Sequence, residues 1–172
     1  MIDTIRTFIK SEVAEITGLR PSLVQYYSDQ KVIEPEENPS GRGTRRRYSK
    51  RNILEILIAK RFVEKGFSLE EAKTVIDWLK RTSDSSVYIN LTELPKNLAK
   101  LKSIQKKFWD IDNWDNKYSV FILVEKKEKP ISFNMQIINR GTTSKIEHKI
   151  SDDTIFLTLV NVTDLIEKIS KI

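Results

Sequence analysis

The residues with the clearest chemical potential form one basic stretch, Gly41-Arg42-Gly43-Thr44-Arg45-Arg46-Arg47-Tyr48-Ser49-Lys50-Arg51. Arginine guanidinium groups donate paired hydrogen bonds to phosphate oxygens, and glycine allows the backbone to approach a partner closely. An ordinary solvated turn is the alternative interpretation. However, three consecutive arginines repel one another unless an anion neutralises them. The stretch, called the wing below, therefore predicts a surface that binds a polyanion.

Little else in the chain has the residue types of a catalytic or metal site. There is no cysteine, which excludes disulfides and thiolate metal ligands, and the single histidine, His148, is expected on the surface of a strand. Asp110, Asp112 and Asp115 have the spacing of metal ligands. They lack the central glycine and terminal glutamate of a calcium loop, so helix termination is the better interpretation. The sequence predicts no enzyme, cofactor or metal site.

The composition is typical of a globular protein, and the net positive charge favours an anionic partner. The chain has 172 residues, enough for one ordinary domain or two small ones, and a net charge of +6. The two halves carry the same basic excess, so the local clustering in the wing is more informative than the total charge. No secretory leader is present, and no apolar run approaches the ~18 residues of a membrane span. We therefore expect a cytoplasmic protein with no membrane segment.

Two short helices are expected before the wing. Residues 10–17 have a helical pattern, and Gly18 predicts a tight turn. A second helix, residues 21–28, begins with a proline, whose missing N–H costs nothing at a first helical position. Val24 and Tyr27 fall on the inner face of this second helix.

Two longer helices are expected after the wing. Ser49 predicts the cap of a helix over residues 50–65, which ends at Gly66. It has too many apolar positions for a narrow stripe, so much of the helix should be buried. These positions are Ile53, Leu54, Ile56, Leu57, Ile58, Phe62 and Val63. Ser68-Leu69-Glu70-Glu71 is a capping box for a helix to about Lys80. The inner face of that last helix is formed by Ala72, Val75, Ile76 and Leu79.

Four segments in this order resemble the MerR family of bacterial transcription regulators. They are residues 9–18, Leu23-Val24-Gln25-Tyr26-Tyr27, residues 41–49, and Gly66-Phe67-Ser68-Leu69-Glu70-Glu71. The resemblance covers residues 8–80. It implies a mostly α winged helix-turn-helix domain in residues 1–80 that binds an inverted-repeat operator as a homodimer. In many such regulators an effector bound by the C-terminal region changes the dimer, which then distorts promoter DNA.

On this resemblance, the helix over residues 21–28 enters the major groove of double-stranded DNA. Gln25 stands where the family usually has arginine, and Arg20 where serine or threonine commonly caps the helix. Glutamine can bond adenine at two points, although a solvent-facing Gln25 is the alternative. Tyr48 is expected to pack the wing onto the domain, and contact with DNA is the less favoured alternative. The candidate DNA-contacting residues are Ser11, Arg20, Ser22, Gln25, Tyr26, Arg42, Arg45, Arg46, Arg47 and Tyr48.

The C-terminal half is predicted to be a separate small α+β domain with an antiparallel sheet. Residues 81–94 are the expected linker, and residues 95–172 the domain for dimerisation and for an effector or a protein partner. Phe108, Trp109 and Trp114 are weak candidates for an effector pocket, and a hinge in the core is the favoured alternative. The expected elements are a strand over 87–91, a helix over 95–109, strands over 118–125, 131–140, 145–150 and 154–160, and a helix over 164–172 capped by Thr163.

These features predict a sequence-specific DNA-binding regulator of the MerR type. The alternative is an architectural, chromosome-organising protein whose C-terminal domain binds another protein, possible because strand edges there could pair with a partner. The number of genomic binding sites distinguishes the two: few promoters for a regulator, broad coverage for an architectural protein.

Overall fold

The computed structural model describes residues 6–37, 45–82, 111–113, 118–126, 132–139 and 156–172. The chain divides into two compact units, Met1–Asp77 and Trp78–Ile172, which are described separately. Several predictions lie outside the described residues: Arg42, the strand over 87–91, the helix over 95–109, the aromatic cluster Phe108, Trp109 and Trp114, and His148 with the strand over 145–150.

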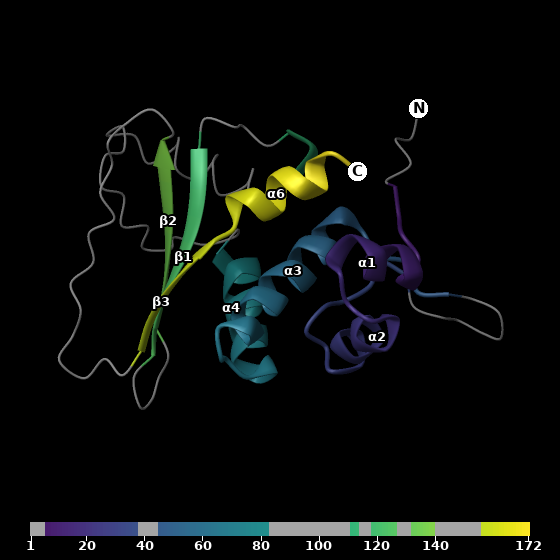
Figure 1. The fold of residues 1–172 in the computed structure, drawn as a ribbon, viewed down its shortest axis with the longest axis horizontal. Coiled ribbons are helices and arrows are strands. Elements are labelled where there is room, and N and C mark those ends of the chain that lie inside the picture. Colours follow the sequence, from purple (N-terminus) through teal and green to yellow (C-terminus); the bar gives the residue numbers. More distant parts are fainter. Residues whose placement is uncertain (1–5, 38–44, 83–110, 114–117, 127–131, 140–155) are drawn as a thin grey trace. The chain divides into compact units, whose positions relative to one another are not determined.

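The first unit begins with a helix-turn-helix made of α1 (Lys10–Thr17) and α2 (Pro21–Asp29), shown in Figure 1. Gly18 has the left-handed conformation predicted for the turn, with φ 67° and ψ 26°. Pro21 is the first residue of α2, and the preceding residue, Arg20, makes no side-chain capping hydrogen bond. The proline therefore compensates for a poor cap by fixing φ in advance.

Helix α3 (Lys50–Glu64) forms the centre of the first unit. Its first turn is closed by a reciprocal pair: the Asn52 N–H donates to Ser49 Oγ, and the Ser49 N–H to Asn52 Oδ1, both at 3.2 Å. Residues 52–59 are all buried, as the dense apolar pattern predicted. Val63, the last of the apolar positions, is 40% exposed because the last turn of the helix, including Arg61 and Glu64, faces solvent.

A buried carboxylate lies within α3. Glu55 is only 1% exposed. Its Oε1 accepts from Arg51 Nε at 3.3 Å, and its Oε2 accepts from Asn52 Nδ2 at 3.4 Å. Asn52 Nδ2 also donates to the Glu34 carbonyl at 3.0 Å, which ties α3 to the loop after α2. These partners offset part of the cost of burying a charge.

Helix α4 (Leu69–Thr82) follows Gly66, whose φ is 89°. The predicted capping box is present: the Ser68 N–H donates to Glu71 Oε2 at 2.7 Å, and the Glu71 N–H to Ser68 Oγ at 3.1 Å. The helix extends two residues beyond Lys80, its predicted end. Its predicted inner face is buried, namely Ala72, Val75, Ile76 and Leu79.

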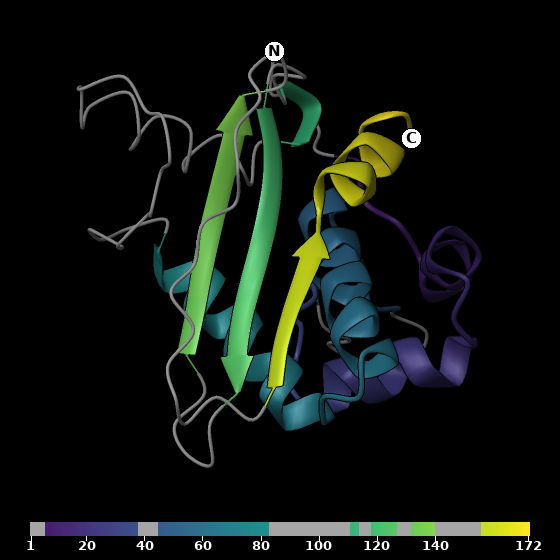
Figure 2. The same ribbon diagram turned by 60° about the vertical axis from the view of Figure 1, so that its left-hand side comes forward.

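The second unit contains a three-stranded antiparallel sheet of order β2-β1-β3, with β1 in the centre (Figure 2). Its strands are β1 (Tyr118–Lys126), β2 (Ser132–Asn139) and β3 (Phe156–Asn161), preceded by a 3-10 turn, η1 (Ile111–Asn113). Ile122 of β1 is buried and pairs with Met135 of β2 and Val160 of β3.

Helix α6 (Thr163–Ser170) closes the chain and buries Leu165, Ile166 and Ile169. The prediction that Thr163 caps this helix was wrong, because Thr163 is its first residue and Val162 holds the capping position. The Thr163 N–H donates to Asn161 Oδ1 at 3.0 Å. An Asn side chain two residues upstream thus supplies the acceptor that was expected from threonine.

Candidate nucleic-acid interface

The outer face of α2 is polar and exposed. Ser22, Gln25 and Asp29 are exposed there, and the Tyr26 ring is 48% exposed. The opposite face buries Val24 at 0% and Tyr27 at 4%, which anchors α2 to the core. Since its inner face is fully engaged, α2 offers a fixed polar ridge to a partner.

The base of the wing is held by two isolated antiparallel bridges, Glu37 with Arg47 and Phe8 with Tyr48. The Arg47 N–H donates to the Glu37 carbonyl at 3.1 Å. The Phe8 N–H donates to the Tyr48 carbonyl at 2.8 Å, and the Tyr48 N–H returns a bond to Phe8 at 2.9 Å. The segment before α1 therefore pairs with the wing, a long-range contact that no local sequence pattern indicated.

The side chain of Tyr48, one of the candidate DNA-contacting residues, lies in the core. It is 0% exposed, and its hydroxyl lies 3.1 Å from Ser28 Oγ in the interior. The ring packs beneath α2, because the bridge to Phe8 places it on the core side of the wing. This result agrees with the packing role favoured for Tyr48 from the sequence.

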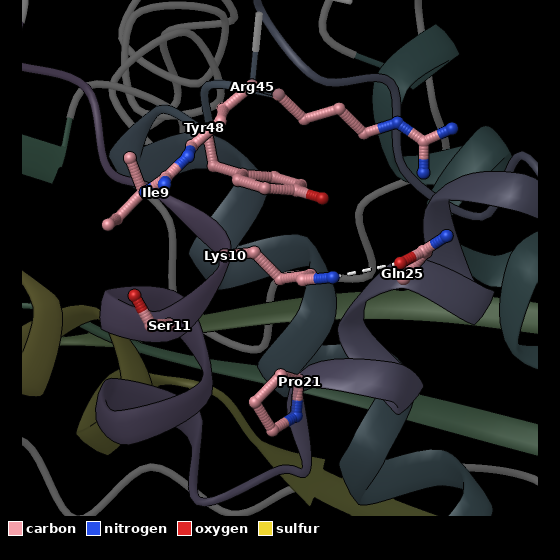
Figure 3. Close-up of a pocket in the computed structure, with 8 residues that line it drawn as sticks. Ile9, Lys10, Ser11, Pro21, Gln25, Arg45 and Tyr48 are labelled. Atoms are coloured by element: carbon pink, nitrogen blue, oxygen red, sulfur yellow. Dashed lines mark hydrogen bonds between the residues drawn. The ribbon is translucent and has the colours of Figure 1, made fainter. Parts of the chain in front are cut away.

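The first turns of α1 and α2 and the base of the wing enclose a hollow of about 490 Å³ (Figure 3). It is lined by Ile9, Lys10, Ser11, Pro21, Gln25, Arg45, Arg46 and Tyr48. Three of these side chains are cationic, and the N-terminal ends of helices also favour anions. The electrostatic character of the hollow is therefore that of an anion site.

Two polar links cross the edges of this hollow. Lys10 Nζ donates to Gln25 Oε1 at 2.9 Å, a bond visible in Figure 3. Arg46 Nη2 lies 2.7 Å from Asp29 Oδ1, with the two side chains 26% and 45% exposed. The Arg46 Nε–H is buried and has no acceptor among the described residues.

The structure brings together only some of the predicted contact residues. Ser11, Gln25, Arg45 and Arg46 line the hollow. Arg20, Ser22 and Tyr26 are exposed but do not line the hollow. Arg47 is half-buried at its bridge to Glu37. Sequence reasoning missed Lys10 and Asp29, whose importance comes from partners distant in the chain.

Residues 10–78 match the family model described as MerR HTH family regulatory protein. The N-terminal domain is a MerR-family helix-turn-helix domain. The match begins at the first residue of α1 and ends within α4, so it includes both helices of the helix-turn-helix, the wing and α3. The MerR-family match makes this chain a DNA-binding transcriptional regulator. A search among curated proteins found no match to the chain.

In the part of the chain that the structure describes, no helix combines the length and apolar character needed to cross a membrane. Within the same residues, no group of three or more His, Cys, Asp or Glu side chains could hold a metal ion.

Proposed function

We propose that the protein regulates transcription by binding an inverted-repeat operator as a homodimer, with α2 in the major groove and the wing on the phosphate backbone. The observation that carries this proposal is the cationic hollow. Lys10, Arg45 and Arg46 converge there, beside the exposed polar ridge of α2.

The dimensions of α2 support its entry into DNA. An α-helix with its side chains is about 10–12 Å in diameter, and the major groove is about 12 Å wide. Ser22, Gln25 and Tyr26 are exposed along it, so polar groups would meet the base edges and the neighbouring phosphates. The anchoring of Val24 and Tyr27 holds that ridge in one orientation.

Arg45 is the strongest phosphate candidate in the wing. It is exposed and lines the hollow, whereas Arg46 is already paired with Asp29 and Arg47 is half-buried. Arg42 remains a candidate on sequence alone. We propose that the wing supplies affinity while α2 supplies sequence choice, since phosphate contacts carry no base information.

A salt series of fluorescence-anisotropy titrations tests the proposal, using a duplex selected from random DNA. Affinity should fall linearly in log–log terms, by a slope of roughly 0.9 for each phosphate contact. Arg45→Ala should reduce that slope by about 0.9 and weaken all duplexes alike. Lys65→Ala removes an exposed charge that does not line the hollow and serves as the control. Affinity that does not depend on salt would contradict DNA binding through phosphates.

The homodimer and the operator need their own measurement. Light scattering on the complex should give two protomers on a full inverted repeat, and one half-site alone should bind much more weakly. Genome-wide binding should then identify a few promoter sites. Broad coverage of the chromosome would instead favour the architectural role, with the second unit binding another protein.

A further inference from the structure

The inference concerns the hydrogen bond from Lys10 Nζ to Gln25 Oε1, 2.9 Å long and exposed to solvent. It joins the first residue of α1 to the exposed ridge of α2, and both side chains line the hollow (Figure 3). Resting on the proposed DNA-binding function, we propose that Lys10 is a specificity-determining residue that makes Gln25 select guanine over adenine.

The bond determines which end of the Gln25 amide is available. An ammonium group has three donors and no acceptor, so the amide must turn its oxygen toward Lys10. The amide nitrogen, with two donors, is then the end directed away from Lys10. The orientation follows from the chemistry of the partner.

The groups of Lys10 and Gln25 that remain available to a base are therefore mainly hydrogen-bond donors. To bond adenine at two points, glutamine must accept from N6 and donate to N7, which requires its oxygen to face the base edge and not Lys10. Guanine presents two acceptors, O6 and N7, at the same edge. The Gln25 amide N–H groups and the remaining Lys10 N–H donors match those acceptors, and the positive charge adds to the attraction.

Neighbouring charges support this polarity. Arg45 and Arg46 also line the hollow, so its surroundings favour an acceptor-rich partner. Asp29, one helical turn after Gln25, is the nearby acidic group, and one of its oxygens is occupied by Arg46 at 2.7 Å. The ridge thus presents donors at Gln25 and a partly neutralised acceptor at Asp29.

The test measures base preference at every half-site position for the full-length protein and its variants. Gln25→Ala identifies the position that Gln25 reads, because the preference there should disappear. At that position the unaltered protein should bind guanine about tenfold better than adenine, within the range for a bidentate base contact. Replacing that guanine by 7-deazaguanine, which lacks the N7 acceptor, should weaken binding several-fold.

Lys10→Met keeps the length of the side chain but frees the amide oxygen. It should lower the guanine-to-adenine ratio at least fivefold, whereas Lys10→Arg, which retains donors, should preserve it. Lys65→Met is the control for loss of one charge and should leave the ratio unchanged.

Three results would overturn the inference. They are a preference for a base other than guanine at the Gln25-dependent position, no such position at all, or the same ratio in Lys10→Met as in the unaltered protein. If Lys10→Met does not fold, Lys10→Ala, which also removes the donors, takes its place, and the 7-deazaguanine duplex tests the guanine contact separately. Failure of the protein to bind any duplex would instead contradict the proposed function, so the two failures are distinguishable.

Discussion

At the scale of single residues, the ion pair of Arg46 and Asp29 has two consequences. It joins the base of the wing to the C-terminal turn of α2 across 2.7 Å. It also places a carboxylate on the face proposed to meet DNA, where it opposes phosphate binding. Because both side chains are partly exposed, their contribution to stability is screened and should stay below about 1 kcal/mol.

Asp29→Asn should therefore change DNA binding more than stability. Loss of the carboxylate frees the Arg46 guanidinium for phosphate, so the salt slope should steepen by roughly 0.9 while the denaturation midpoint changes little. The measurement is the anisotropy salt series beside urea denaturation. Glu15→Gln, an exposed carboxamide substitution on α1, is the matched control. An unchanged slope would show that Arg46 does not reach phosphate when released.

Tyr27 gives a prediction about alkaline pH. Burial, and secondarily the Glu64 carboxylate, raises the pKa of Tyr27 above its ordinary value of 10.0. The neutral phenol is favoured in the folded state, so this stability is complete below pH 10.0 and is lost as pH rises through the folded pKa. Tyr27→Phe should make the free energy of unfolding less dependent on pH above 10.0. Equal pH dependence in both proteins, measured by urea denaturation, would rule out this contribution.

At the scale of elements, the turn between α1 and α2 fixes the angle between α1 and the polar ridge of α2. Gly18 has φ 67°, and its N–H donates to the Glu15 carbonyl at 3.4 Å. Lys60 Nζ donates to the Thr17 carbonyl at 2.9 Å, so α3 also holds the end of α1. The turn is thus determined by local backbone conformation and by one contact from the core.

Gly18→Ala should reduce the free energy of unfolding by about 1–2 kcal/mol, the cost of a left-handed conformation for a residue with Cβ. Space is not the cause, because the nearest atom to an added Cβ is Lys60 Nζ at 3.5 Å. Gly66→Ala, at φ 89° with nothing within 4 Å, is the comparison. Both variants should lose stability, but only Gly18→Ala should also weaken operator binding. Equal operator affinity of the two variants, at a temperature where both are folded, would show that the turn does not affect DNA recognition.

Local elements were the part of the fold that the sequence predicted well. The helix over residues 10–17 has its predicted bounds, and the Ser49 cap and the Ser68 capping box have their predicted bonds. These features depend on residues within one helical turn of each other, so sequence carries them. The Thr163 cap was predicted wrongly because the helix starts one residue earlier, with Val162 at the capping position and Asn161 Oδ1 accepting from the Thr163 N–H.

At the scale of the whole molecule, the division of the chain into two compact units falls inside one helix. The division falls between Asp77 and Trp78, inside α4, which ends at Thr82. The predicted domain boundary at residue 80 also falls inside this helix. A cut that leaves α4 whole must therefore follow Thr82.

A fragment of residues 1–82 should retain the helix-turn-helix and the α3 core, because it contains the whole of α4. We expect cooperative thermal unfolding by circular dichroism and residual, salt-dependent binding to a half-site. A fragment of residues 1–77 lacks the last five residues of α4, so it should melt at a lower temperature. Identical melting of the two fragments would show that residues 78–82 add nothing to the first unit.

The sequence by itself determined the short-range structure and the family: helix starts and stops, the left-handed glycines, and four motifs in the order of a MerR-family domain. Tertiary structure decided which residues distant in the sequence pair with one another. Lys10 and Gln25, Asp29 and Arg46, and Phe8 and Tyr48 are each paired across at least fifteen residues. Their pairing depends on how α1, α2 and the wing pack together, and side-chain direction after packing is not encoded in any local pattern.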